Sequence, residues 1–240
     1  MFFDIHSHIL PDVDDGAQSI DTTRRMLEFA YQQGIRRMMA TPHFYADMDA
    51  QIFPKWKQAY NTTSSLAREI DLNFTIHRGA EVYYDSRIIP LLKQGAPLSL
   101  HGSRFILVEF PGAVDFTYLT YAVRELQYAG YRPVLAHIER YRVLQNERNV
   151  AGLCEMGVWM QVNAGTVAGK SGLGVRRYIL RLIRKGYIHI IGTDAHGVEV
   201  RQPLMIKCAA ILDKKVGSEI RDSLCRRNFM EILKGEEHID

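Results

Sequence analysis

The sequence predicts an α/β fold in which a mostly parallel sheet carries helices on its outer side. One unit recurs along the chain: an amphipathic helical stretch, then a glycine (Gly34, Gly130, Gly157, Gly186), then a short apolar strand. Counting the strand at the N-terminus, seven strands are expected, mostly separated by helices. This alternation favours a parallel sheet with helices packed against it. The 240 residues are 47% hydrophobic and show no shift in composition, so one domain spanning residues 1–240 is expected.

The first predicted strand, residues 2–6, leads into a group of residues that can bind a metal ion. Asp4, His6 and His8 occupy alternate positions, so on a strand they point to one face, and the apolar residues between them point the other way. Two imidazoles at this spacing, next to a carboxylate, can hold one metal ion. A second pair with the same spacing, Asp194 and His196, follows another apolar strand near the far end of the chain.

The other elements follow in order. A helix is expected from Ser19 to Gln33, with Ser19 as its N-cap and Gly34 at its end. A strand follows at 35–41, and the longest insertion, residues 44–70, is interpreted as a loop and then a helix. The remaining strands are expected at residues 73–80, 105–109, 134–136, 158–160 and 188–191. After Ser218 the chain predicts one or two short helices packed on the sheet.

The composition narrows the classes of function. A net charge of +3, with basic residues spread along the helices, does not indicate nucleic-acid binding. We find neither a signal peptide nor an apolar run long enough to span a membrane, so no membrane insertion is expected. The three cysteines, Cys154, Cys208 and Cys225, are far apart and fit reduced thiols, which predicts a cytoplasmic location. The oligomeric state is left open.

Polar residues stand at the C-terminal end of every predicted strand. After His6 and His8 they are, in order, His43, Glu81, Glu109, His137, Asn163, Asp194 and His196. Each alone is equally well explained as a solvated carboxylate or a hydrogen-bonded histidine. In parallel α/β barrels, however, this rim carries the active site. Five imidazoles and several carboxylates are too many for one ion, and the mixture suits two or three ions of manganese, iron or zinc.

Several motifs, taken together, resemble a known family. They are Asp4-Ile5-His6-Ser7-His8, Asp14-Asp15-Gly16, Thr41-Pro42-His43, Gly79-Ala80-Glu81, His137-Ile138-Glu139-Arg140-Tyr141 and Asp194-Ala195-His196. In this order they resemble the polymerase and histidinol phosphatase (PHP) superfamily. Within it, the chain is most similar to the bacterial capsule and exopolysaccharide protein-tyrosine phosphatases. The resemblance covers nearly the whole chain and implies a distorted seven-stranded (β/α) barrel, TIM-like, with a trinuclear metal site at the C-terminal rim.

The resemblance also implies a role for individual residues. The first metal would be held by His6, His8, Glu81 and Asp194, the second by Glu81, Glu109 and His137, and the third by Asp15, His43 and His196. Arg140 and Arg201 match the arginines that hold phosphate. The three divalent ions are expected to be manganese, with iron or zinc as alternatives. The implied activity is hydrolysis of phosphotyrosine in proteins, and the implied partner is the tyrosine-rich tail of a membrane-bound bacterial tyrosine kinase that controls polysaccharide export.

Alternatives stay open at this point. A small-molecule phosphatase of the histidinol-phosphate type is the alternative enzyme hypothesis. A third hypothesis, not an enzyme, is a catalytically silent barrel that only binds a partner. A thiolate mechanism is disfavoured because no cysteine has an arginine six positions later. His77 and His189 are interpreted as core or outer-face histidines. The aromatic residues Phe44, Tyr45, Tyr83, Tyr84 and Tyr141 either line a pocket for a phenyl ring or are ordinary packing groups.

Overall fold

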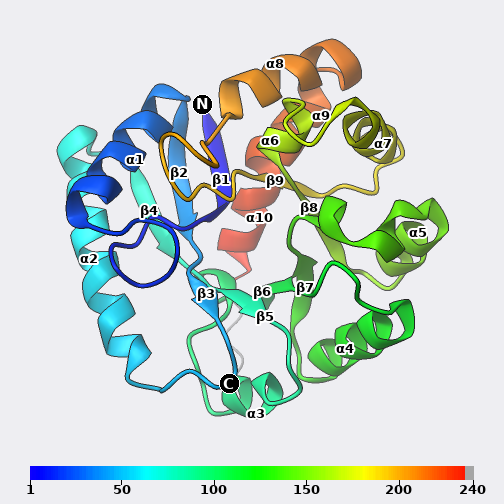
Figure 1. Ribbon diagram of the computed structural model, residues 1–240, viewed down its shortest axis with the longest axis horizontal. Helices are drawn as coiled ribbons and strands as arrows, with labels where there is room; N and C mark the ends of the chain where they lie inside the picture. The colour runs from blue at the N-terminus through cyan, green and yellow to red at the C-terminus, as the bar shows by residue number, and fades with distance from the viewer. Residues whose placement is uncertain (236–240) are drawn as a thin grey trace.

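A computed structural model describes residues 1–235 of the chain. Its strands curl around a common centre, and most of the helices lie outside them (Figure 1). The strands are β1 (Phe2–Ser7), β2 (Ile35–Ala40), β3 (His43–Phe44), β4 (Thr75–Arg78), β5 (Glu81–Tyr83), β6 (Phe105–Glu109), β7 (Arg132–Leu135), β8 (Trp159–Asn163) and β9 (Ile190–Gly192). Every pairing between them is parallel, in the orders β1-β2-β4 and β3-β5-β6-β7-β8-β9. The α/β class and the parallel sheet are therefore confirmed.

The helices fall largely where the hydrophobic periodicity predicts them. They are α1 (Ile20–Gln32), α2 (Ile52–Ile70), α3 (Ile88–Lys93), α4 (Phe116–Tyr128), α5 (Glu147–Glu155), α6 (Ala164–Val167), α7 (Leu173–Arg184), α8 (Met205–Val216), α9 (Ser218–Asp222) and α10 (Asn228–Lys234). Short 3-10 turns are η1 (Leu100–Gly102), η2 (Ile138–Arg140) and η3 (Arg142–Gln145), and η4 (Ser223–Arg227) is a π-helical turn. Ser19 caps α1 by accepting a hydrogen bond from the backbone of Thr22.

Residues 1–235 contain nine strand segments where the sequence predicts seven strands. The strands expected at 35–41 and 73–80 are β2 and β4, and each is followed beyond its predicted end by a second segment, β3 after Thr41–Pro42 and β5 after Gly79–Ala80. Pro42 has no backbone N–H to give to a neighbouring strand, which favours a break there. Its carbonyl still accepts from the backbone N–H of Glu81 at 3.0 Å, so the two interruptions lie side by side. Beyond them, β3 and β5 continue into the larger sheet.

The first and last strands meet at their C-terminal ends. The N–H of Asp194 donates to the carbonyl of His6 at 2.8 Å, and the N–H of His8 donates to the carbonyl of Ala195 at 2.9 Å. Ser7 and Ala195 form an isolated parallel bridge. Residues from the two ends of the chain are thereby brought together at one place on the rim.

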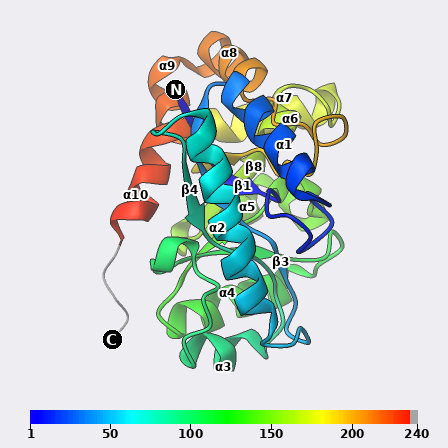
Figure 2. The same cartoon turned by 90° about the vertical axis from the view of Figure 1, so that its left-hand side faces the viewer.

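An apolar cluster fills the inside of the curled sheet. Phe3 and Ile5 of β1 belong to it, together with Leu107, Val134, Trp159, Ile190, Phe229 and Ile232. The ring of Phe229 on α10 lies 5.4 Å from that of Phe3, so the C-terminal helices pack against this cluster as the sequence predicts. Figure 2 shows α10 on one side of the sheet and the loop after β1 on the other.

No helix in residues 1–235 is both long enough and apolar enough to cross a membrane.

Candidate metal centre

All nine residues expected to bind metal lie in one cluster at the C-terminal rim. The innermost group contains Nε2 of His6 and His8, Oε2 of Glu81 and Oδ1 of Asp194. Oε2 of Glu81 lies 3.1 Å from the first nitrogen and 3.2 Å from the second, and Oδ1 of Asp194 lies 3.5 Å from each. All four side chains are almost completely buried. Four inward-facing donor atoms, two nitrogens and two oxygens, are a set that suits a divalent transition metal.

Glu81 also takes part in a second group. Its Oε1 lies 2.7 Å from Nε2 of His137, which is 3.4 Å from Oε1 of Glu109. Its other oxygen, Oε2, lies 3.1 Å from Nδ1 of His43. Because both oxygens of Glu81 face donor groups on different strands, this carboxylate is placed to bridge two ions.

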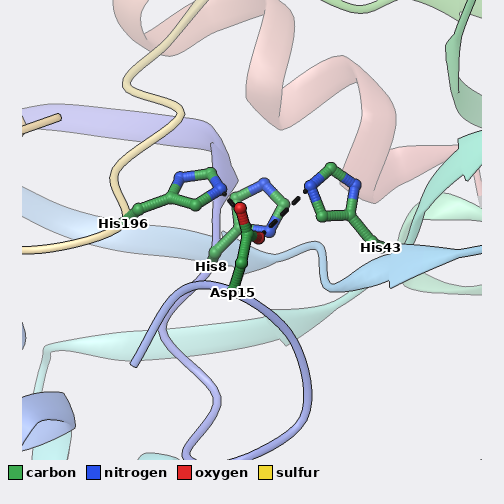
Figure 3. Close-up of side chains that lie close together, drawn as sticks. All are labelled: His8, Asp15, His43 and His196. Carbon is green, nitrogen blue, oxygen red and sulfur yellow. Dashed lines mark ion pairs between the residues drawn. The ribbon is translucent and has the colours of Figure 1, made fainter. Parts of the chain in front are cut away.

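The third group lies closest to solvent and is drawn in Figure 3. Oδ1 of Asp15, on the loop after β1, lies 3.2 Å from Nε2 of His196 and 3.4 Å from Nε2 of His43. The ring of His8 lies behind them, 3.9 Å from the ring of His196. Donor atoms of His8, Asp15, His43 and His196 all lie within 4.8 Å of one another. His8 thus stands between the inner group and this outer one.

Hydrogen bonds behind the cluster fix the orientation of three of its five histidine rings. Nδ1 of His8 donates to Asp14 at 2.7 Å, and Nδ1 of His6 donates to the side-chain oxygen of Gln161 at 3.2 Å. Nδ1 of His196 donates to the carbonyl of Asp194 at 3.0 Å. When Nδ1 carries the proton, the lone pair of Nε2 faces the cluster, and partners of this kind are typical of metal-binding histidines.

Several buried atoms of the cluster have no hydrogen-bond partner in the part of the chain that the structure describes. They include Oε2 of Glu81, Nδ1 of His43 and Nε2 of His196. A buried polar atom left unpaired costs free energy, and such atoms in a native protein call for an explanation, of which a bound ion is one. The chemistry of these atoms therefore fits a metal centre.

The carboxylates make the cluster a negatively charged environment, which favours the binding of cations, both protons and metal ions. Burial alone would raise the pKa of Asp194, but the charge of His6, the hydrogen bond from His8 and the charge of Arg140 hold it well below its usual range. Burial opposes protonation of His8, yet Asp14, Asp194 and Glu81 raise its pKa well above the ordinary value. Burial, followed by the nearby charge of Glu81, raises the pKa of Glu109.

The two predicted phosphate-holding arginines lie at the edge of this cluster and share one carboxylate. Nη2 of Arg140 is 2.5 Å from Oδ2 of Asp194, and Nη2 of Arg201 is 2.6 Å from Oδ1. Both guanidinium side chains are partly exposed, at 42% and 33%. They border a pocket of about 370 Å³ to which Lys170 also contributes. Cationic side chains beside the candidate metal ligands suit a doubly charged phosphate.

Three residues of the candidate site have a positive φ, a backbone conformation that is uncommon outside glycine. His137 has a φ of +31°, and Asp194 and Arg201 each have +53°. Conformations of this kind cost free energy and concentrate at functional sites.

Glycine is needed where β9 passes His6, because a Cβ on Gly192 would lie 2.7 Å from the Cβ of His6. The local backbone is thus shaped around the cluster.

Asp4 shares the spacing of His6 and His8 but is not one of the residues expected to bind metal, and it lies outside the groups of candidate ligands. Its carboxylate accepts hydrogen bonds from the backbone N–H of Thr193 at 2.8 Å and from the hydroxyl of Thr193 at 2.5 Å. Burial raises the pKa of Asp4 to about 6 despite these bonds. Asp4 therefore ties β1 to the segment that follows β9.

Sequence reasoning missed one residue behind the cluster. Gln161 on β8 is fully buried, and its side-chain oxygen accepts from the N–H of His137 at 2.7 Å as well as from His6. Its amide nitrogen donates to Asn163 at 2.8 Å, and Asn163 donates to Asp194 at 2.9 Å. The only available signal was a glutamine between apolar residues, directly after the strand predicted at 158–160 and before Asn163.

The residues set aside at the sequence level lie outside the cluster. His189 stacks on Trp159 and its Nδ1 accepts from the backbone N–H of Met160, while His77 packs against Phe229 and His101. Cys208 and Cys225 are buried in the apolar core, and Cys154 is half-buried and packs against it. Burial raises the pKa of Cys154 to about 11, so this thiol is not an activated nucleophile.

Comparison with known proteins places the chain among bacterial relatives. A family model described as capsular polysaccharide synthesis, CpsB/CapC, matches residues 2–234. Tyrosine-protein phosphatase CpsB of Streptococcus pneumoniae is 30% identical over 96% of this chain and 97% of its own length. Tyrosine-protein phosphatase YwqE of Bacillus subtilis (strain 168) is 32% identical over 90% of this chain and 86% of its own.

A solved structure is similar to this one over almost its whole length. It comes from the crystal structures of YwqE from Bacillus subtilis and CpsB from Streptococcus pneumoniae, described as unique metal-dependent tyrosine phosphatases. The TM-score is 0.87 at 31% identity, and the match covers 97% of this chain and 94% of the other. The fold described above is therefore shared with proteins whose phosphatase activity depends on metal.

Proposed function

This chain belongs to the capsular polysaccharide synthesis CpsB/CapC family, and we propose that it is a metal-dependent protein-tyrosine phosphatase. The observation that carries the proposal is the cluster of nine histidine and carboxylate side chains beside two guanidinium groups. Buried donor atoms without partners support metal binding, and the paired arginines support an anionic substrate. The similarity to tyrosine phosphatases of 30–32% identity supports phosphotyrosine as that substrate.

The proposed centre holds three divalent ions. His6, His8, Glu81 and Asp194 would hold the first, Glu81, Glu109 and His137 the second, and Asp15, His43 and His196 the third, with manganese preferred over iron or zinc. Bound ions of this kind neutralise phosphate charge and lower the pKa of bound water. The curled sheet is proposed to be a distorted seven-stranded barrel in which β2 with β3 and β4 with β5 each count as one strand.

The chain's own residues then have separate tasks. Gln161, Asp14 and the carbonyl of Asp194 hold three imidazoles with Nε2 toward the cluster. Arg140 and Arg201 hold the phosphate oxygens, because guanidinium groups make paired hydrogen bonds to such groups. No cysteine nucleophile takes part. The proposed protein substrate is the tyrosine-rich tail of a membrane-bound bacterial tyrosine kinase, and the proposed location is the cytoplasm.

The test is a comparison of substrates and metals on the purified protein. The protein is stripped with a chelator, checked by elemental analysis, and supplied separately with Mn²⁺, Fe²⁺, Zn²⁺ and Mg²⁺. Each form is assayed with a phosphotyrosine peptide, the matching phosphoserine peptide and histidinol phosphate. We expect turnover of the phosphotyrosine peptide only with metal. Full activity in metal-free protein contradicts the metal-dependent mechanism, and preference for histidinol phosphate favours the small-molecule alternative.

A further inference from the structure

Two tyrosines stand at the rim directly beside the candidate metal centre. Tyr45 follows His43 by two residues, and Tyr83 follows Glu81 by two residues. His43 and Glu81 are direct partners in the parallel pairing of β3 with β5. Residues two apart along an extended chain lie on the same face. Both tyrosines therefore continue the face that carries His43 and Glu81, one step further along.

The contacts of the two rings agree with this placement. The ring of Tyr45 lies 5.5 Å from the ring of Tyr83, with an angle of 36° between the planes, and 6.0 Å from the ring of His43. Tyr83 is also the direct partner of Glu109 in the pairing of β5 with β6. The two rings thus form a continuous aromatic surface, the aromatic wall, that begins at candidate ligands of the metal centre.

The aromatic wall differs from the other aromatic side chains near the centre in its access to solvent. Phe44, Tyr84 and Tyr141 are between 1% and 4% exposed and pack in the core. Tyr45 is 38% exposed and Tyr83 is half-buried. Neither hydroxyl makes a hydrogen bond within residues 1–235. Of the five aromatic residues considered for a phenyl pocket, only these two offer a ring surface to a ligand.

The charge of the aromatic wall is compatible with an anionic substrate. Tyrosine side chains are ordinarily uncharged near pH 7. A neutral aromatic surface attracts another ring without repelling the phosphate attached to it. Aromatic pairs with centroids roughly 4.5–7 Å apart stabilise one another beyond the area that they bury.

Resting on the proposed phosphatase function, we infer that Tyr45 and Tyr83 receive the phenyl ring of an aryl phosphate and so select phosphotyrosine over aliphatic phosphomonoesters. The phosphate faces the cluster and the arginines, and its ester oxygen points toward Tyr45 and Tyr83. The phenyl ring of phosphotyrosine meets the aromatic wall there, whereas the short side chain of phosphoserine does not. The wall acts on binding, so its loss raises KM more than it lowers kcat.

The test compares two phosphonates that cannot be hydrolysed, phenylphosphonate and methylphosphonate. Their affinities for the metal-loaded protein are measured by calorimetry in Tyr45→Ala, Tyr83→Ala and the double variant. We expect the ratio of phenyl to methyl affinity to fall about 2- to 10-fold for each ring removed. Tyr45→Phe and Tyr83→Phe should keep the parent ratio, because the ring and not the hydroxyl makes the contact.

Tyr128→Ala is the matched control, because this tyrosine of α4 is 85% exposed and makes no ring contact in the described part of the chain. Damage to the metal centre would weaken both phosphonates alike, and metal content is measured in every variant. If the ratio of phenyl to methyl affinity is unchanged in the double variant, whether or not both affinities fall, the inference is overturned. If the parent protein fails to hydrolyse phosphotyrosine peptides with every metal, the proposed function fails instead.

Discussion

Arg201 donates a hydrogen bond to the carboxylate of Asp194 at 2.6 Å, and both residues hold a positive φ of +53°. An arginine proposed to hold phosphate is thereby tied to a carboxylate proposed to hold metal. A metal ion at Asp194 would use the same carboxylate oxygen that accepts the hydrogen bond from Arg201. Asp194 Oδ1 also faces His6 and His8, so if this oxygen held a metal ion, the guanidinium of Arg201 would be left available to a phosphate.

Replacing Arg201 should reduce turnover without removing metal. A charged donor of this kind typically contributes on the order of 2–4 kcal/mol to the transition state, so Arg201→Ala should lower kcat/KM roughly 30- to 1000-fold. Arg201→Lys should recover only part of this, because an ammonium group cannot make the paired hydrogen bonds of a guanidinium. The measurements are turnover of a phosphotyrosine peptide and bound metal.

Two further variants make the result interpretable. His137→Ala should lose both metal and activity, because its Nε2 lies 2.7 Å from Glu81. Arg177→Ala changes an exposed arginine on α7 and should behave as the parent. Parent-like turnover in Arg201→Ala would assign this arginine to the surface and remove it from the site.

Much of the fold could be predicted from local patterns. The strand at Phe2–Ser7 and the helix that begins after Ser19 follow from periodicity and capping, and both are confirmed. The number of strands could not be predicted, because the breaks at Pro42 and Gly79 depend on how neighbouring strands turn together into the second sheet. A single sequence shows Pro42, but it does not show that the neighbouring strand is interrupted at the same level.

The grouping of the polar residues was predictable for a different reason. Parallel strands deliver their C-terminal residues to one rim, so His43, Glu81 and Asp194 come together although they are far apart in sequence. The hydrogen bonds behind them are not predictable from one sequence. Asp4 resembles a ligand by spacing but bonds Thr193, and Gln161 resembles a core residue but bonds His6.

Gln161 should act as a positioning residue whose loss weakens metal binding. Gln161→Leu keeps the size of the side chain but removes the oxygen that accepts from the ring of His6 and the backbone of His137. Loss of such an outer partner typically lowers metal affinity roughly 10- to 100-fold. Calorimetry with Mn²⁺ measures the change, and excess Mn²⁺ should restore most of the turnover.

Gln58→Ala on the exposed side of α2 is the matched control and should bind Mn²⁺ like the parent. Unchanged affinity in Gln161→Leu would show that the ring of His6 is oriented by its other neighbours. Activity that stays low at saturating Mn²⁺ would point to a role for Gln161 beyond metal binding.

The three cysteines should be dispensable for catalysis. Cys208 and Cys225 are buried in the apolar core, away from the metal centre, and Cys154 donates to the carbonyl of Tyr187. Replacement of each by alanine should keep most of the turnover. The two buried positions should each lose about 1 kcal/mol of unfolding free energy, because a small cavity forms. A folded, metal-loaded variant without turnover would revive the thiolate mechanism.

His189 should make the protein less stable in acid, independently of the metal centre. Burial, followed by the charge of Arg132, lowers the pKa of His189 to about 4 in the folded protein, against an ordinary value of 6.5. Its Nδ1 accepts the backbone N–H of Met160 at 3.1 Å, and protonation would break this hydrogen bond. The unfolded chain therefore binds the proton more readily, and stability falls as the pH drops from about 6.5 toward 4.

The size of this effect at pH 5 is about 2 kcal/mol for one such group, from the difference between the two pKa values. His189→Gln should remove that dependence, so its unfolding free energy should change less than the parent's between pH 7 and pH 5. His77, whose pKa burial also lowers to about 4, keeps its own contribution in this variant. Urea unfolding at the two pH values, on metal-free protein for both chains, separates the effect from metal release. Equal pH dependence in the two proteins would mean that His189 binds its proton equally well in the folded and the unfolded chain, so that its buried position beside Trp159 does not lower its pKa.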